Sequence, residues 1–175
     1  MITKVITKTE IKAVEKLAKE IWTEHYTTII GKEQVDYMLE KFQSEEAIAN
    51  QITSEKYKYY LIRKNENYIG YAAIQVKKEE LFLSKIYIKN SERGRGHGKK
   101  IITFIENLTK ENKLNKITLT VNKNNIKTIK AYKNCGFKNI GALIQDIGNG
   151  FVMNDYVMEK ICTPSSVRKK IGTWQ

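Results

Sequence analysis

The sequence predicts a mixed α/β fold, in which helices cover both faces of a mostly antiparallel sheet of seven strands. Three patterns support this prediction. Residues 9–25 repeat apolar side chains at helical spacing, and residues 57–88 form three short runs rich in branched and aromatic residues. Residues 81–121 then follow a strand–helix–strand order. Because such units cross over with one handedness, their two strands should be parallel neighbours.

The first third of the chain is helical in pattern after a short strand at residues 2–6. Thr7 followed by Glu10 fits a capping box, which marks the start of a helix. Gly31 breaks the helical pattern. Helices are therefore predicted at residues 9–25, at residues 33–42 and in a short segment capped by Ser44.

The rest of the chain alternates between strands and helices. Strands are predicted at residues 57–63, 68–76, 81–88, 116–121, 137–145 and 151–158, and helices at about residues 97–112 and 125–134. The turn Gly148-Asn149-Gly150 should join the last two strands into a hairpin. We expect residues 1–162 to form a single domain and residues 163–175 to form a poorly ordered tail.

Composition narrows the class of protein. Of the 175 residues, 41% are hydrophobic and 29% are charged, which is ordinary for a folded globular chain. No apolar run approaches the roughly 20 residues that span a bilayer, and the N-terminus does not resemble a signal peptide, so we expect a cytoplasmic protein. The cysteines Cys135 and Cys162 lack metal-ligand spacing, so no metal site is expected. A net charge of +12 would suit a polyanion, although the lysines are spread over the whole chain.

A glycine-rich segment lies between the strand at residues 81–88 and the helix that follows. Gly94, Gly96 and Gly98 allow phosphate oxygens to approach the backbone, and the start of a helix offers free N–H groups to an anion. The flanking basic residues are Arg93, Arg95, Lys99 and Lys100. The spacing fits neither the dinucleotide fingerprint nor the P-loop. The segment reads as a diphosphate cradle, and the alternatives are a flexible loop or an Arg/Gly-rich contact to nucleic acid.

A second motif lies downstream of this loop. The loop fits the pattern [QR]-x-x-G-x-[GA], and the later segment has an asparagine, a tyrosine seven residues on, and then Gly-Phe. The matching residues are Arg93, Gly96 and Gly98 in the loop and Asn125, Tyr132, Gly136 and Phe137 downstream. Together the two motifs resemble the signatures of the GNAT acetyltransferase family over about residues 55–160. Thr128 departs mildly, because a small residue such as alanine is usual there.

The resemblance implies the GNAT fold, with acetyl-CoA bound where two parallel strands splay apart, after Ile88 and after Val121. The residues that it assigns to the cofactor are Ile86, Tyr87, Ile88, Arg93, Gly94, Arg95, Gly96, His97, Gly98, Lys99, Asn125 and Tyr132. A backbone N–H of residues 86–88 would polarise the thioester carbonyl. Tyr132 would protonate the departing thiolate, because an ordinary tyrosine is protonated at pH 7.

The general base is harder to assign. Glu79, Glu80, Glu24 and His25 are candidates by position, and Glu80 and His25 are taken as catalytic candidates beside Tyr132. Each could instead be a surface residue. His25 also lies on the apolar stripe of its helix, where a buried core histidine is an alternative.

The acceptor should be a small amine. Trp22, Glu24, Tyr26 and Phe151 are expected to bind it, with acidic residues nearby at Glu33, Asp36, Glu40, Glu45 and Glu46. An aromatic and acidic pocket suits a cationic amine such as a polyamine, and the sequence resembles bacterial family members thought to act on polyamines. The alternatives are acetylation of a protein N-terminus or lysine, and a basic nucleic-acid-binding module without catalysis. A homodimer through the C-terminal hairpin is also open.

Overall fold

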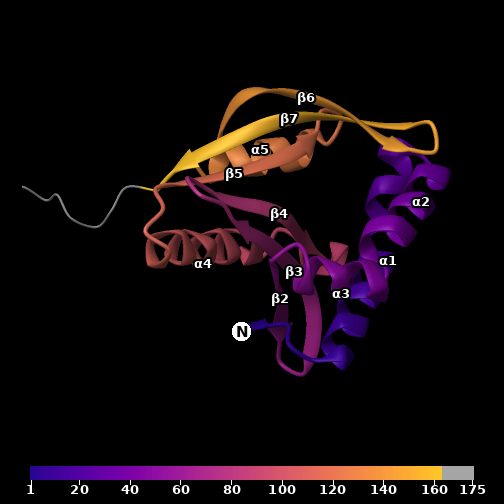
Figure 1. Cartoon of the computed structure of the whole chain (residues 1–175), viewed down its shortest axis with the longest axis horizontal. Coiled ribbons are helices and arrows are strands. Elements are labelled where there is room, and N and C mark those ends of the chain that lie inside the picture. Colours follow the sequence, from indigo (N-terminus) through magenta and orange to yellow (C-terminus); the bar gives the residue numbers. More distant parts are fainter. Residues whose placement is uncertain (163–175) are drawn as a thin grey trace, which may run out of the picture.

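The computed structural model describes residues 1–162, which form one seven-stranded sheet with helices on both faces (Figure 1). The elements are β1 (Ile2–Lys4), α1 (Lys8–Ile30), α2 (Lys32–Gln43), α3 (Glu45–Thr53), β2 (Tyr57–Lys64), β3 (Asn67–Val76), β4 (Leu81–Ile88), the short 3-10 helix Asn90–Glu92, α4 (His97–Glu111), β5 (Lys116–Asn122), α5 (Ile126–Asn134), β6 (Lys138–Gly148) and β7 (Phe151–Ile161). The predicted tail, residues 163–175, lies outside the described residues.

The sheet is mixed, as the sequence predicts. Its strand order is β1-β2-β3-β4-β5-β7-β6, and β4 and β5 are the parallel pair while the other neighbours run antiparallel. The parallel pair comes from the strand–helix–strand step through α4, so the predicted fold class is confirmed.

Helix α1 begins at the predicted capping box. The Thr7 hydroxyl accepts the Glu10 N–H at 3.2 Å, and the Glu10 carboxylate accepts the Thr7 N–H at 2.8 Å. Its buried stripe, Val14, Leu17, Ala18, Ile21 and Trp22, faces the sheet. The helix runs to Ile30, beyond the predicted end at residue 25, and stops at Gly31, whose φ of 87° favours glycine. The longer helix keeps His25 and Tyr26 on a rigid element.

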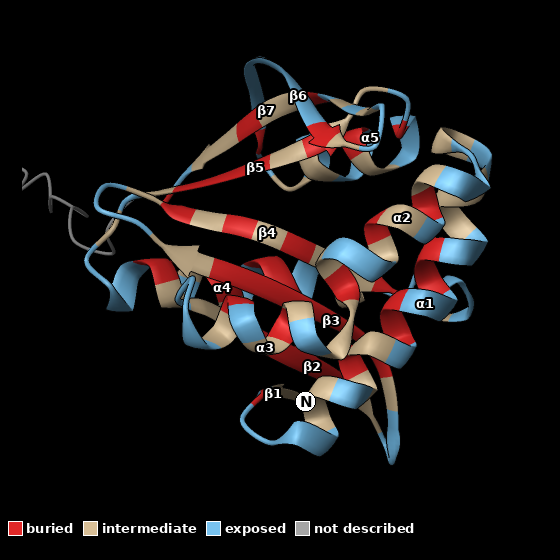
Figure 2. Ribbon diagram, turned by 45° about the vertical axis from the view of Figure 1, so that its right-hand side comes forward, coloured by how far each residue is buried: buried red, intermediate tan, exposed pale blue. Residues whose placement is uncertain are grey.

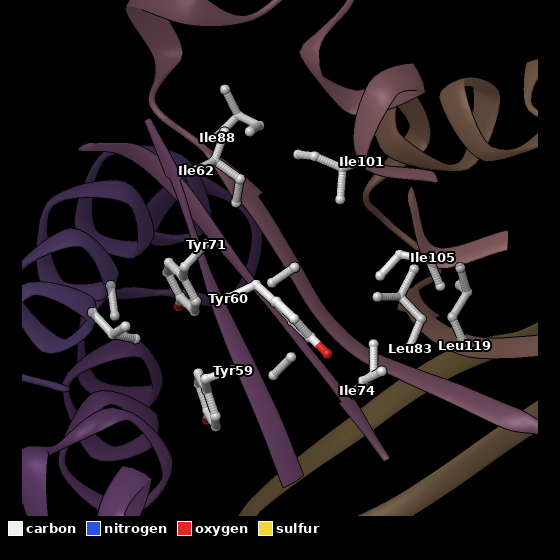
Figure 3. Packing of buried hydrophobic residues seen from close by; sticks show 14 of the residues in the cluster. Tyr59, Tyr60, Ile62, Tyr71, Ile74, Leu83, Ile88, Ile101, Ile105 and Leu119 are labelled. Carbon is white, nitrogen blue, oxygen red and sulfur yellow. The ribbon is translucent and has the colours of Figure 1, made fainter. Parts of the chain in front are cut away.

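The core lies on both faces of the sheet (Figure 3). On one face the hydroxyl groups of Tyr59 and Tyr71 donate to glutamines of α3 and α2, Gln51 and Gln43. On the other face Leu83 and Leu119 of the strands pack near Ile105 of α4, and all three are at most 2% exposed. The central strands are therefore packed against side chains on both faces of the sheet.

Strand β4 carries a β-bulge opposite β3. Ala73 pairs with Lys85 and Ile74 pairs with Leu83, so Ser84 is the extra residue. The bulge turns Lys85 into the layer of α3, where its Nζ donates to Gln51 Oε1 at 3.0 Å. Burial lowers the pKa of Lys85 to about 8.

Strands β4 and β5 touch only at their starts. The parallel pairs are Leu81 with Ile117 and Phe82 with Thr118, and beyond them the strands diverge (Figure 2). The edge of β4 that faces β5 is therefore unpaired from Leu83 onward. This opening in the middle of the sheet positions the site described next.

Candidate functional site

A cavity of about 670 Å³ runs through the opening between β4 and β5. Its walls come from both sides of the sheet, because residues of α4 and α5 line it together with residues of α1 and α2. The size is that of a site for a small organic ligand. The cavity has two functional ends, one at the start of α4 and one between α1 and β7.

The glycine-rich loop lines the first end. Gly94 has a φ of 74° and Gly96 a φ of 81°, both in the left-handed region, and Gly96 precedes α4 without a side-chain cap. Apart from the adjoining backbone and neighbouring residues in the chain, no described atom lies within 4 Å of the place where a Cβ would stand at Gly94, Gly96 or Gly98. Uncapped helical N–H groups beside open space fit an anion, and Arg93 and Lys99 line the same end. The residues present therefore fit the diphosphate of coenzyme A.

Glu92 forms polar contacts at the start of this loop. Its carboxylate accepts from Lys64 Nζ at 2.9 Å and lies 3.3 Å from His97 Nε2. The hydrogen bond from Lys64 is the main cause that lowers the pKa of Glu92. His97 lines the cavity, whereas Arg95 does not and lies 3.9 Å from Glu92. Of the residues predicted to bind the cofactor, Arg95 and Asn125 do not line the cavity.

A chain of hydrogen bonds links the two sides of the opening. Arg93 donates from Nε to the Ile88 carbonyl at 3.0 Å and from Nη1 to His25 Nδ1 at 2.9 Å. His25 Nε2 lies 3.3 Å from Asn125 Oδ1, and Asn125 donates from Nδ2 to the Tyr26 hydroxyl at 3.4 Å. Asn125 stands before α5 and is 2% exposed. The chain therefore ties the end of β4 to the start of α5 through α1.

Tyr132 lies on α5 and lines the cavity. Its ring packs against Phe137 with 5.5 Å between ring centroids, which fixes the hydroxyl's direction. Burial raises the pKa of Tyr132 well above its ordinary value, so the phenol stays protonated. Its hydroxyl has no hydrogen-bond partner among residues 1–162, which leaves it free to serve a ligand.

Aromatic rings form one wall of the second end. Trp22 packs on Tyr26 with centroids 4.8 Å apart and on Tyr87 with centroids 5.3 Å apart, and all three line the cavity. Burial raises the pKa of Tyr26 to about 12. These neutral rings offer the electron-rich faces that bind cations.

Three of the residues predicted for catalysis or for acceptor binding also lie away from the cavity. Glu80 stands where β4 and β5 are still paired, at the closed end of the opening, and it contacts Lys77 at 3.7 Å and Lys116 at 3.9 Å. Glu24 accepts a hydrogen bond from Asn90 at 3.3 Å, and Phe151 packs on Tyr37. The structure therefore does not bring these three residues together with Tyr132. The other acidic residues that were predicted near the acceptor or as a general base do not line the cavity either: Glu33, Asp36, Glu40, Glu45, Glu46 and Glu79.

The second end also contains a buried carboxylate that was not predicted from the sequence. Asp155 of β7 is 3% exposed and lines the cavity at its second end. Burial raises its pKa to about 6. A signal existed, because Asp155 alternates with Met153 and Val157, which makes it the charged member of an apolar series in a half-buried strand.

Helix α2 lies against the last hairpin, beside the second end of the cavity (Figure 1). The Tyr37 hydroxyl donates to the Ile147 carbonyl at 2.7 Å, and Gln34 Nε2 donates to the Val152 carbonyl at 3.3 Å. Both bonds hold α2 on the tip of the β6–β7 hairpin. Helix α2 therefore contributes Gln34 and Met38 to the wall of this second end, which forms a chamber beside the hairpin.

In the part of the chain that the structure describes, no group of three or more histidine, cysteine, aspartate or glutamate side chains could hold a metal ion. None of the helices there has the length and apolar character that crossing a membrane requires.

The chain matches a known protein family. The model of the acetyltransferase (GNAT) domain matches residues 26–160. No curated protein matches the chain.

Solved structures share the fold at low identity. A PaiA N-acetyltransferase from Thermoplasma acidophilum, in complex with coenzyme A, is 19% identical with a TM-score of 0.71, covering 92% of this chain and 99% of its own. The ribosomal-protein-S18-alanine N-acetyltransferase from Escherichia coli is 16% identical with a TM-score of 0.70, covering 96% and 97%. A chimera of a spermidine N-acetyltransferase from Vibrio cholerae and hSSAT is 20% identical with a TM-score of 0.66, covering 91% and 95%.

The family match spans most of the chain and includes the glycine-rich loop, the diverging strands and Tyr132. The chain therefore belongs to the acetyltransferase (GNAT) family, and it is an N-acetyltransferase whose acetyl donor is acetyl-CoA.

Proposed function

We propose that this enzyme transfers the acetyl group of acetyl-CoA to the primary amine of a small cationic molecule of the polyamine kind. One observation carries the proposal: a single cavity joins a glycine-rich loop suited to an anion to a chamber with aromatic walls and a carboxylate. The two ends match the two substrates, one with a diphosphate and one with a positive charge.

The donor end supplies binding and orientation. Free N–H groups at the start of α4, with Arg93 and Lys99, would hold the diphosphate. The unpaired edge of β4 beyond Phe82 offers backbone groups to the pantetheine arm. When bound, acetyl-CoA supplies an acetyl group activated as a thioester. The cavity passes through the sheet, so this arrangement would bring the acetyl group toward the acceptor chamber and make the reaction effectively unimolecular.

Two groups of the chain would serve the chemistry. A backbone N–H along residues 86–88 can donate to the carbonyl oxygen as negative charge develops on it. Tyr132 is protonated and has no other partner among the described residues, so it can give its proton to the departing thiolate.

The second end has features that suit a small cationic acceptor. Gln34 of α2 lines it, and the bonds from Tyr37 and Gln34 hold this helix against the β6–β7 hairpin beside it. The faces of Trp22 and Tyr26 suit an ammonium group on a flexible chain. Among the similar structures, one is a chimera named for spermidine and another is named for a ribosomal-protein alanine, so both acceptor classes belong in the test.

The test is an acetyl-transfer assay with defined acceptors. Purified protein and acetyl-CoA would be mixed with spermidine, putrescine, or peptides with a free N-terminus or lysine, and release of free coenzyme A would be followed. We expect turnover of a polyamine with kcat/KM at least about tenfold above that of any peptide. Turnover of peptides alone would contradict the small-acceptor proposal while keeping the enzyme class.

A further inference from the structure

We infer that Asp155 is the carboxylate that binds the acceptor amine and takes its proton. The inference rests on the proposed function, since it assigns the recognition of the amine at the same site. It starts from position: Asp155 lies on β7, opposite Asn122 of β5, and it lines the acceptor end of the cavity.

Asp155 is buried with unmet bonding capacity. It is 3% exposed, and its Oδ1 is shielded from solvent without a hydrogen-bond partner among residues 1–162. A buried carboxylate oxygen without a partner is destabilising, so such groups are retained where a ligand supplies the partner. An ammonium group has three N–H donors and a positive charge, so it can donate the hydrogen bond that Oδ1 lacks.

No other described carboxylate competes for this role. Two carboxylates line the cavity within residues 1–162, Asp155 and Glu92. Glu92 lies at the diphosphate end and is already bonded to Lys64 and His97. Asp155 is thus the one described carboxylate in the acceptor chamber.

The groups around Asp155 allow its carboxylate to accept a proton. Thr120 of β5 and Lys123 lie near enough to favour its charged form, whereas burial opposes that form more strongly. Tyr26 of α1 is neutral, and the neighbour from β6 is Leu143, which pairs with Asp155 across the strands. From α2 the cavity receives Gln34 and Met38, which carry no charge. His25, on α1, is held neutral by its surroundings.

The proton balance is complete. The ammonium gives one proton to Asp155, which later passes it to solvent, and the neutral amine attacks the carbonyl carbon of the thioester. As the C–S bond breaks, Tyr132 protonates the thiolate, and the nitrogen loses its second proton to the tyrosinate, directly or through water. The burial that brings the Asp155 pKa from 3.8 to about 6 makes the first transfer roughly 100-fold less unfavourable than it would be to an ordinary aspartate.

The experiment compares Asp155→Asn with Glu159→Gln. Glu159 lies on the same strand and the same face, contacts Lys116, and does not line the cavity, so it controls for loss of a carboxylate from β7. Each variant would be assayed from pH 5 to 9 with spermidine and with peptide amines, and acetyl-CoA binding would be measured by calorimetry. Thermal melts would show that both variants fold.

We expect the wild type to show an acidic limb of kcat/KM near pH 6, and we expect Asp155→Asn to lose that limb and about 100-fold or more in kcat/KM, with unchanged acetyl-CoA affinity. Glu159→Gln should keep both. Retained activity and an unchanged pH profile in Asp155→Asn would overturn the inference. If the wild type acetylates only peptides, the small-acceptor proposal fails and the same comparison on peptides decides the role of Asp155. A wild type that acetylates no amine would overturn both.

Discussion

Arg93 donates a hydrogen bond from Nη1 to Nδ1 of His25 across 2.9 Å. A guanidinium group only donates, so Nδ1 must carry no proton and Nε2 must carry it. Nε2 faces Asn125 Oδ1 at 3.3 Å and donates to it. Burial, and then the charge of Arg93, lower the pKa of His25. The imidazole is therefore neutral with both nitrogens engaged, which favours a positioning role over that of a base.

Replacing His25 by alanine should weaken acetyl-CoA binding. The variant frees Arg93 and Asn125, and the loss of two hydrogen bonds is worth a several-fold change in affinity. Calorimetry should show a Kd about three- to tenfold higher, while the acidic limb of kcat/KM stays near pH 6. Loss of that limb in His25→Ala would instead make His25 the base.

Replacing Gly96 by aspartate should abolish acetyl-CoA binding. The side chain would stand at a left-handed residue in the diphosphate loop and add a negative charge there. Gly31→Asp is the matched control, because Gly31 also has a positive φ and open space around it but lies outside the cavity. We expect Kd to rise more than about 100-fold for Gly96→Asp alone. Equal losses in the two variants would mean that the effect is one of backbone strain.

Replacing Tyr132 by phenylalanine should lower kcat and leave acetyl-CoA binding intact. Only the hydroxyl is lost, and the ring can keep its contact with Phe137. We expect kcat to fall about 10- to 100-fold, because the thiolate must then leave without this acid. Tyr68→Phe, on β3 and outside the cavity, should retain full turnover. A Tyr132→Phe enzyme with wild-type kcat would assign the proton to another donor.

Replacing Tyr37 by phenylalanine should weaken the contact between α2 and the β6–β7 hairpin beside the acceptor chamber. The variant loses the 2.7 Å bond to the Ile147 carbonyl, which helps hold α2 on the hairpin. Steady-state kinetics should show a KM for the amine about three- to tenfold higher and little change in the KM for acetyl-CoA. Equal changes in both KM values would show that the contact stabilises the whole domain.

The sequence predicted the elements of this fold better than the depth at which single residues lie. The capping box at Thr7, the strand–helix–strand step and the glycine loop depend on local patterns, and all three are confirmed. By contrast, Lys85 and Asp155 are charged residues that the structure buries. Lys85 is turned inward by a bulge, which no local pattern predicts.

The glycine-rich loop could be located from the sequence, whereas the wall of the second end could be predicted only in part, for a physical reason. The loop is one contiguous segment, so its glycines and the helix start that follows it are visible in the local pattern. The acceptor chamber joins residues far apart in the chain, such as Trp22, Met38 and Asp155, so only the fold shows that they meet. Glu80 illustrates the limit: it precedes the cofactor strand, but it stands at the paired end of that strand and not at the opening.

Asp155→Asn should make the protein more stable at neutral pH even as it loses activity. The native pKa of about 6 lies above the ordinary 3.8, so burying the charged form destabilises the native state wherever Asp155 is ionised. That cost is fully present above about pH 6, shrinks as the pH falls, and vanishes below about pH 4, because the folded and unfolded chains then both carry the proton. With about 1.4 kcal/mol for each pKa unit, the variant should gain about 1–3 kcal/mol in unfolding free energy at pH 8 and about half as much at pH 5. Urea titrations at the two pH values measure this difference, with Glu159→Gln as the control that should show no such gain. If Asp155 had a purely structural role, Asp155→Asn should instead lower the free energy of unfolding, because the wild-type side chain would then stabilise the native state.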